Sequence, residues 1–307
     1  GVYDLEKTIR NMLDNTLGAG RNSQETIFSI AVNEQDEDRY WSKSFELRYP
    51  GLLLVSYPYK GVTVADFETN DYTSPKINIS TVKKIYPDEK DIRLKEYWYG
   101  LDTLTYMDPY GDMYWDEELG EWVSVPVKAS CKYAYINKWN KPINSVNPSI
   151  FETGEASLLA MDGDRVVWRL ADLILLRAEC RARLKMSTAV DDLDRIRERA
   201  GLEKYTGSTE PENLRKEIFY ERERELFGEG QRYFDIVRNG YSQDKYPFKY
   251  PDYGYGSYGE GDLISNKYPE LKDDDIKNGA LYLPVARKSM DNNTVVKQNI
   301  YWLWHQN

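Results

Sequence analysis

The chain is poor in the residues on which many active sites depend. Among its 307 residues there is one histidine, His305, and there are two cysteines, Cys131 and Cys180. A single histidine three residues from the C-terminal end argues against histidine-based catalytic triads and histidine metal sites. Two cysteines are too few for a disulfide framework and lack CxxC or other metal-binding spacing, so the sequence predicts no metal site. Whether the two cysteines pair stays open.

Long apolar runs and excess positive charge are also missing. The longest apolar run, residues 51–55, has the length of a strand and falls far short of the roughly 20 residues that span a bilayer. The chain has 51 acidic and 41 basic side chains and a net charge of -10, which disfavours nucleic acid as a partner. It begins "GVYDLEK", without a methionine or a signal peptide, so we expect a mature chain or a fragment.

Aromatic residues, in contrast, are abundant. The chain has 26 tyrosines and 8 tryptophans. These side chains combine a flat apolar face with a polar edge, which suits sugar rings and partner surfaces. They also pack well in sheets, and composition alone does not separate the two uses.

The first half predicts an irregular region with short strands. Residues 3–15 have the pattern of a short helix, and residues 25–32 alternate like a strand. Between about residues 33 and 160, short aromatic segments are separated by turn signals. We expect a hairpin over residues 103–115 with its turn at 109–112, and a strand over 132–139.

From about residue 165 the pattern becomes helical. The segment "RVVWRLADLILLRAECRARL" (165–184) predicts a helix whose buried stripe includes Trp168, Ala171, Leu175, Ala178 and Ala182. Ser187 is expected to cap a second helix that ends at Gly201. Two such helices joined by a tight turn form a hairpin of roughly 34 residues, the size of a tetratricopeptide unit.

Two further helices are expected before an irregular tail. Thr209 and Glu212 predict a capping box with Pro211 in the first turn, and the helix should reach about Phe227. Residues 231–239 predict a short fourth helix, and 241–307 predict an aromatic loop and tail.

The third helix carries charges on its apolar side. Arg222 and Glu225 fall in its apolar arc, and Glu179 lies on the apolar stripe of the first helix. Glu221, Glu223 and Arg224 are expected to lie largely outside the arc. These charges suggest either a catalytic acid with a shifted pKa or a buried structural network. Arginines accompany nearly every glutamate and would lower carboxylate pKa values, which favours the structural interpretation.

Several ordered segments resemble one known family. Residues 165–184, "LDRIRERAGL" (193–202), "LRKEIFYERERELFGEGQRYFDIVRNG" (214–240) and the tail "LYLPVARKSMDNNTVVKQNIYW" (281–302) are similar to the C-terminal portion of SusD/RagB-type glycan-binding lipoproteins. The segments at 25–32 and 89–100 resemble family blocks as well. Gln231 stands where histidine is common in the family, and Ile92 replaces a proline.

The resemblance implies a fold and a role. The fold would be mainly α, a SusD-like α–α superhelix with a tetratricopeptide-like hairpin and a loop-rich region containing short strands. We expect one domain over 1–307, without the family's N-terminal helical-repeat region. The resemblance implies no catalysis and no cofactor, but cell-surface binding of oligosaccharide and its delivery to a TonB-dependent (SusC-like) outer-membrane transporter. An N-terminal lipid anchor, outside this chain, would hold the protein on the outer membrane.

The same resemblance places ligand-binding aromatics in loops ahead of the helical region. The corresponding candidates are Tyr40, Trp41, Tyr57, Tyr59 and Tyr72, followed by Trp98 and Tyr99, and then by Tyr110, Trp115 and Trp122. For any single ring, packing in the core or in a strand is the more common role.

Two alternatives to a glycan-binding protein remain. A glycoside hydrolase needs two carboxylates across a cleft, for which Asp108 with Asp112, or Glu117 with Glu118, are the candidates. The other alternative is a purely structural adaptor of the uptake complex that docks through its helical hairpin.

Overall fold

The computed structural model describes residues 2–19, 23–30, 76–99, 101–107, 112–130, 133–138, 164–239, 253–254, 273–291, 293 and 295–304. Contacts divide the chain into two compact units. One comprises residues 1–232 and 252–262, and the other comprises residues 233–251 and 263–307. The expectation of one domain over 1–307 stays a prediction.

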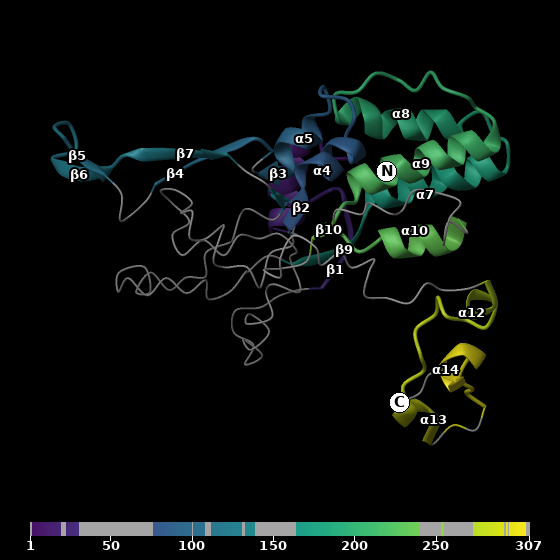
Figure 1. The fold of residues 1–307 in the computed structure, drawn as a ribbon. Coiled ribbons are helices and arrows are strands. Elements are labelled where there is room, and N and C mark those ends of the chain that lie inside the picture. Colours follow the sequence, from purple (N-terminus) through teal and green to yellow (C-terminus); the bar gives the residue numbers. More distant parts are fainter. Residues whose placement is uncertain are drawn as a thin grey trace. The chain divides into compact units, whose positions relative to one another are not determined.

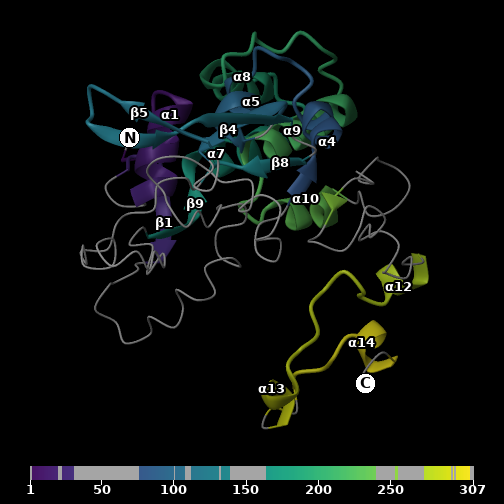
Figure 2. The ribbon, with the colours of Figure 1, turned by 60° about the vertical axis from the view of Figure 1, so that its left-hand side comes forward.

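Three helices form the core of the larger unit. Helices α7 (Leu170–Arg183), α8 (Ala189–Arg199) and α9 (Pro211–Glu225) lie side by side (Figures 1 and 2). Their buried faces are apolar and are built from Ala171, Ile174, Leu175, Ala178, Ala182, Ala189, Leu193, Ile196, Leu214 and Ile218. The small alanines let α7 and α8 approach closely, and the predicted helical hairpin is confirmed.

The first helix starts later than the sequence predicts. Residues Arg165–Arg169 form strand β9, which pairs antiparallel with β1 (Thr26–Ile30). Arg169 has extended backbone angles (φ -128°, ψ 160°), and α7 begins directly after it. Placing Trp168 on the helical stripe was therefore wrong. The pairing with β1 decides this, and the consecutive β-branched Val166 and Val167 are compatible with a strand.

The helix caps also differ from the prediction. The residues that precede α8 and α9 are Thr188 and Glu210, and neither side chain caps its helix. The predicted cap at Ser187 and the Thr209–Glu212 capping box are therefore wrong. Pro211 does occupy the first turn of α9, where its missing N–H leaves no hydrogen bond unmade.

The N-terminal segment is helical over a shifted range. Residues 2–6 are not helical, α1 (Ile9–Asn11) follows, and it runs directly into a π-helix, η1 (Met12–Ala19). The hydroxyl of Thr8 accepts a hydrogen bond from the Asn11 N–H and fixes where α1 starts. Ile9, Met12, Leu13 and Leu17 are buried, so packing places this turn rather than local propensity.

A small antiparallel sheet lies beside the helices. Its strand order is β10 (Tyr253–Gly254), β2 (Lys76–Asn78), β8 (Tyr133–Ile136) and β3 (Trp98–Tyr99). Two short helices, α4 (Ile79–Ile85) and α5 (Ile92–Glu96), connect β2 to β3. The expected strand within 132–139 is confirmed as β8.

The predicted hairpin over residues 103–115 is wrong. Strand β4 (Thr103–Met107) pairs with β7 (Pro126–Ser130), and β5 (Met113–Asp116) pairs with β6 (Glu121–Ser124). The turn is at residues 117–120, where an Asp116 carboxylate oxygen accepts hydrogen bonds from the Glu118 and Leu119 N–H groups at 2.9 and 3.0 Å. Gly120 closes this turn in the left-handed region (φ +66°).

The smaller unit holds three short helices, α12 (Asp273–Lys277), α13 (Arg287–Asp291) and α14 (Ile300–Trp304). The Gln298 amide both donates to and accepts from the Val285 backbone at 3.0 Å, and the Trp302 indole donates to the Tyr282 carbonyl at 2.6 Å. Helix α10 (Arg232–Asn239) confirms the expected fourth helix. In the part of the chain that the structure describes, no helix is long and apolar enough to cross a bilayer.

Candidate functional site

Helix α9 carries a column of glutamates. Glu217, Glu221, Glu225 and Glu229 are spaced four residues apart, so the three within the helix lie on one face and Glu229 follows in the turn after it. Glu221 and Glu225 have fully buried side chains, and 12% of the Glu229 side chain is exposed. Buried carboxylates require cations, and the structure supplies them from distant segments.

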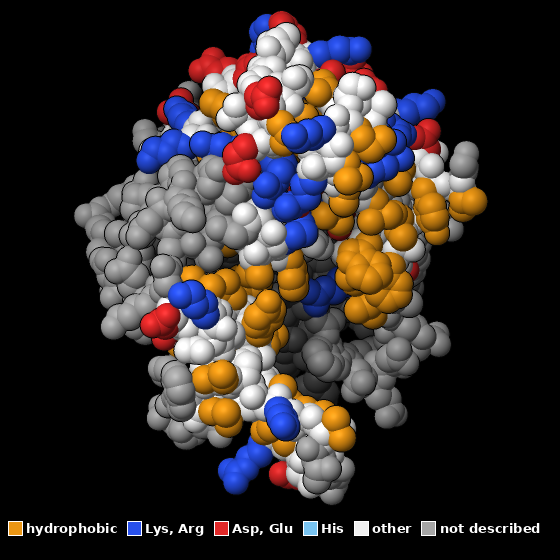
Figure 3. Space-filling model, turned by 90° about the vertical axis from the view of Figure 1, so that its right-hand side faces the viewer, with side chains coloured by type: hydrophobic (Ala, Val, Ile, Leu, Met, Phe, Trp, Pro, Cys, Tyr) orange, Lys and Arg blue, Asp and Glu red, His pale blue; other side chains and the backbone are white. Residues whose placement is uncertain are grey.

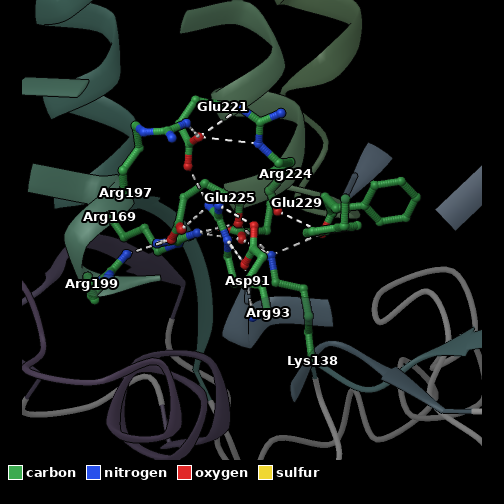
Figure 4. Close-up of polar contacts among 12 residues, drawn as sticks. Asp91, Arg93, Lys138, Arg169, Arg197, Arg199, Glu221, Arg224, Glu225 and Glu229 are labelled. Carbon is green, nitrogen blue, oxygen red and sulfur yellow. Dashed lines mark hydrogen bonds and ion pairs between the residues drawn. The ribbon is translucent and has the colours of Figure 1, made fainter. Parts of the chain in front are cut away.

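Glu225 is the centre of this arrangement (Figure 4). One of its carboxylate oxygens pairs with Arg169 at 2.8 Å and with Arg199 at 2.5 Å, and the other pairs with Arg93 at 3.0 Å. Arg169 ends β9, Arg199 ends α8 and Arg93 lies in α5. One glutamate therefore connects α9 to three other segments of the larger unit.

A second shell of contacts surrounds Glu225. Glu25, just before β1, accepts from Arg169 at 2.8 Å and from Arg199 at 2.6 Å. Lys138, just after β8, donates to the Glu225 carbonyl at 2.9 Å and to the Glu229 carboxylate at 2.5 Å. Its ammonium also lies 4.3 Å from the centre of the Tyr97 ring.

The third part of the arrangement centres on Arg93. Its guanidinium pairs with Asp91 at 2.8 Å and with Glu221 at 2.7 Å, and Glu221 also pairs with Arg224 at 2.9 Å. We call the whole set the buried charge cluster. It has five carboxylates and five cations, and its members are Glu25, Asp91, Glu221, Glu225, Glu229, Arg93, Lys138, Arg169, Arg199 and Arg224.

The cluster keeps Glu221, Glu225 and Glu229 ionised. Burial disfavours the charged form of Glu225, but Arg199, Arg169 and Arg93 outweigh this effect and hold its pKa well below the usual range. Arginine neighbours likewise overcome burial and lower the pKa of Glu221 and of Glu229. Carboxylates that stay ionised, buried and paired cannot act as general acids at neutral pH.

Two further ion pairs involve the helices, one between α9 and α7 and one within α7. Arg222 donates to the Asp172 carboxylate at 2.7 Å and to its carbonyl at 3.0 Å, which ties α9 to α7. Glu179 accepts from Arg183 at 2.9 Å along α7. The expectation that Arg222, Glu225 and Glu179 are buried and paired is confirmed.

The prediction for the neighbouring charges was wrong. Glu221, Glu223 and Arg224 were expected largely outside the buried arc, yet all three are buried. Helical period alone assumes one neighbouring surface, whereas α9 is covered on more than one side. The four-residue spacing of the glutamates was the signal in the sequence that pointed to this second buried face.

The predicted sugar-binding aromatics differ in whether the structure describes them and in whether they are exposed. Tyr40, Trp41, Tyr57, Tyr59, Tyr72 and Tyr110 lie outside the described residues, and of Tyr99 only the backbone, in β3, is described. Trp98 is only 3% exposed, and its ring packs edge-on against Phe227 and Tyr86, with centroids 4.8 and 6.1 Å away. Its ring is a core element, so the prediction that Trp98 is a ligand-binding residue is corrected.

Two exposed aromatic pairs lie on two-stranded sheets. Trp115 and Trp122 face each other across β5 and β6, with centroids 5.8 Å apart and rings nearly perpendicular. Phe28 and Trp168 are partners across β1 and β9, with centroids 5.5 Å apart. Sequence reasoning brought neither pair together, although Trp115 and Trp122 were second-tier candidates.

The remaining candidates are the carboxylates of the hydrolase alternative, possible metal ligands and the cysteines. Asp108 lies outside the described residues, whereas Asp112, Glu117 and Glu118 are exposed. Within the described residues, no group of three or more His, Cys, Asp or Glu side chains is placed to hold a metal ion. Cys180 is an exposed free thiol, and Cys131 lies outside the described residues.

Comparison with known proteins assigns the chain to a family. The SusD family model matches residues 24–302, which is most of the chain. The chain belongs to the SusD family, and the mainly helical, SusD-like fold expected from the sequence is confirmed.

Individual relatives agree with this assignment. The chain is 26% identical over 248 residues to SusD-like protein P38 of Formosa agariphila, covering 74% of this chain and 44% of that protein. A SusD homolog from Bacteroides thetaiotaomicron has a similar fold, with a TM-score of 0.59 and 21% identity over 98% of this chain and 51% of that one. The surface glycan-binding protein A of Bacteroides uniformis has a TM-score of 0.53 and 17% identity, covering 98% and 53%. The chain thus spans about half the length of these relatives.

Proposed function

We propose that this protein binds oligosaccharide at the cell surface without cleaving it and passes it to a TonB-dependent outer-membrane transporter. The observation that carries the proposal is membership of the SusD family over residues 24–302. The fold likeness to a protein described as a surface glycan-binding protein supports it. A lipid anchor in the full-length protein would hold it on the outer membrane.

The charge arrangement supports a role in binding rather than catalysis. The carboxylates that first suggested an active site are buried and are neutralised by five cations. A hydrolase would need one carboxyl group with a raised pKa across a cleft from a second. Instead, the pKa values of Glu221, Glu225 and Glu229 are all lowered.

Sugar contacts would come from aromatic rings in the loops ahead of the helices. Stacking of sugar C–H faces on rings provides affinity, and polar groups at the rim select the hydroxyls. The leading candidate rings stay Tyr40, Trp41, Tyr57, Tyr59, Tyr72 and Tyr99. Tyr110, Trp115 and Trp122 stay candidates behind them, and Trp98 is removed.

A binding screen tests the proposal. The full-length protein is applied to an array of oligosaccharides, and each hit is measured by calorimetry with wild type, Trp41→Ala and Tyr57→Ala. The Phe28→Ala variant is a matched control, because it removes an exposed ring outside the candidate set. We expect binding that weakens at least about tenfold in one of the first two variants and is unchanged in the control.

Two results would contradict the proposal. The first is hydrolysis of a bound glycan that a single carboxylate-to-amide substitution, such as Asp112→Asn or Glu118→Gln, abolishes. The second is failure to bind any oligosaccharide while the protein still co-purifies with the transporter, which would indicate a structural adaptor.

A further inference from the structure

The β5–β6 hairpin (residues 112–125) exposes apolar side chains on both of its faces. Met113, Trp115 and Trp122 lie on one face, with Trp122 62% exposed. Tyr114 lies on the other face, and Leu119 at the turn is 66% exposed. Exposed apolar groups concentrated in one small element indicate an interaction site rather than scattered surface residues.

The charge of this hairpin has one sign. Its 14 residues include five acidic side chains, Asp112, Asp116, Glu117, Glu118 and Glu121, and neither lysine nor arginine. Among the described residues none of the five takes part in an ion pair, in contrast to the glutamates of α9. Asp116 and Glu121 are direct cross-strand partners, a placement of like charges that destabilises a hairpin.

The outer edges of β5 and β6 also offer backbone hydrogen-bonding groups. β5 and β6 form a two-stranded sheet, so each strand has one edge without a neighbouring strand among the described residues. A two-stranded hairpin is marginally stable in water by itself. A third strand added to a free edge would supply main-chain hydrogen bonds and cover apolar side chains.

We propose that the β5–β6 hairpin docks a basic, extended polypeptide segment by strand addition. Lysine or arginine side chains of that segment would meet the five carboxylates and the indole faces of Trp115 and Trp122. Its apolar side chains would cover Met113 and the indoles. The free strand edges and the aliphatic side chains favour a polypeptide over a sugar, and the five carboxylates disfavour a second copy of the same hairpin.

Defined peptides test the docking. The probe is the capped heptapeptide Lys-Val-Lys-Val-Lys-Val-Lys, and its matched counterpart has glutamate in place of each lysine. Binding to the intact chain is followed by tryptophan fluorescence and calorimetry at about 50 mM and about 500 mM salt, which shortens the Debye length roughly threefold. We expect the lysine peptide to bind and the glutamate peptide not to bind. The affinity of the lysine peptide should be lower at high salt.

Three variants locate the binding. Trp115→Ala/Trp122→Ala should weaken binding at least about tenfold at both salt concentrations, because it removes apolar and cation–π contacts. Glu117→Gln/Glu118→Gln/Glu121→Gln should weaken it mainly at low salt. Phe28→Ala/Trp168→Ala removes a comparably exposed cross-strand pair from β1 and β9 and should bind like wild type. Circular dichroism and thermal unfolding confirm that each variant is folded.

Backbone NMR provides a second measurement that does not depend on the variants. Strand addition predicts that amides of residues 113–116 or 121–124 gain protection from hydrogen exchange when the lysine peptide binds.

Four outcomes would overturn the inference. They are equal binding of the glutamate peptide, unchanged affinity in the double tryptophan variant, an equal loss in the Phe28/Trp168 variant, and no protected amide in β5 or β6. Binding of neutral oligosaccharides that requires Trp115 and Trp122 would instead assign the hairpin to glycan, and self-association that requires them would assign it to a second copy.

Discussion

Helix α9 and the β5–β6 hairpin are both rich in glutamate, yet they use it in opposite ways. In α9, Glu221 and Glu225 are buried, and each is paired with arginines from other segments. In the hairpin, Glu117, Glu118 and Glu121 are exposed and have no basic residue near them in sequence. The difference shows that a glutamate-rich segment stabilises the fold where basic residues from distant segments pair with it. Where no such residues pair with it, its carboxylates are available to a partner.

Much of the remaining surface resembles neither extreme. On the face drawn in Figure 3, basic and acidic side chains lie next to one another among hydrophobic ones. Such mixed charges screen each other and contribute little to stability or recognition. The buried charge cluster and the acidic hairpin therefore stand out as two departures from this background.

The largest expected effect is at the centre of the cluster. Glu225→Gln would leave Arg93, Arg169 and Arg199 partly uncompensated in a dry interior, so we expect the free energy of unfolding to fall by about 3–5 kcal/mol. Urea unfolding followed by circular dichroism measures this change. The matched control Glu118→Gln in the hairpin should change stability by less than about 0.5 kcal/mol. Equal effects of the two substitutions would remove the contrast between the regions.

The second-largest effect is expected at acidic pH, where the buried charge cluster should lose stability. The pKa values of Glu221, Glu225 and Glu229 lie below the ordinary value of 4.5, so the unfolded state takes up protons first as pH falls. Stability from these groups is therefore complete above about pH 5 and is lost below it, by about 2–3 kcal/mol near pH 2.5 for Glu225 alone. Urea midpoints measured between pH 6 and pH 2.5 test this, and Glu225→Gln should flatten the slope. An unchanged slope in that variant would show that other groups cause the acid sensitivity.

The third prediction concerns how the buried Lys138 changes the free energy of unfolding at alkaline pH. Burial lowers its pKa from 10.5 to about 8, although Glu229 opposes the shift. Between these values the unfolded state holds the proton that the folded state has lost, so this group makes stability rise with pH. Relative to Lys138→Met, we expect the wild type to gain about 1–2 kcal/mol between pH 8 and pH 9.5. Parallel curves for the two proteins would mean that Lys138 stays charged throughout this range.

The smallest effect is expected in the hairpin turn. Gly120 has φ +66°, and a Cβ there would meet no atom within 4 Å, so Gly120→Ala costs only backbone strain of about 1 kcal/mol. Because the hairpin opens locally, amide exchange in β5 and β6 should accelerate about fivefold while global unfolding stays unchanged. Gly120→Asn should be closer to wild type, because asparagine tolerates this conformation. A loss of global stability would show that the hairpin and the helical core unfold together.

Elements with strong local patterns were predictable. The stripe Ala171, Leu175, Ala178 and Ala182 repeats at helical spacing, and all four residues are buried in α7. The strands β1 and β8 and the helix α10 also appear where the pattern placed them. In these segments local propensity and tertiary packing favour the same structure, so the local signal is sufficient.

Other features were wrong because distant partners decide them. Strand β9 exists because β1, more than 130 residues earlier, pairs with it. Strand β4 likewise pairs with β7 rather than with β5, so that Thr103 lies opposite Ser130. Pairing over such distances leaves no trace in a local window, since the stabilising contacts come from another part of the chain.

The sequence by itself determined the family, the helical hairpin and the acidic excess, because these depend on composition and on short-range periodicity. Only the tertiary structure decided which charges are structural. It buried Trp98, and it buried Glu221 and Glu225 together with arginines from α5, α8 and β9. It left Trp115, Trp122, Glu117, Glu118 and Glu121 exposed. The physical reason is that the fate of a carboxylate depends on burial and on the cations within about 4 Å of it, and those come from segments far away in the sequence.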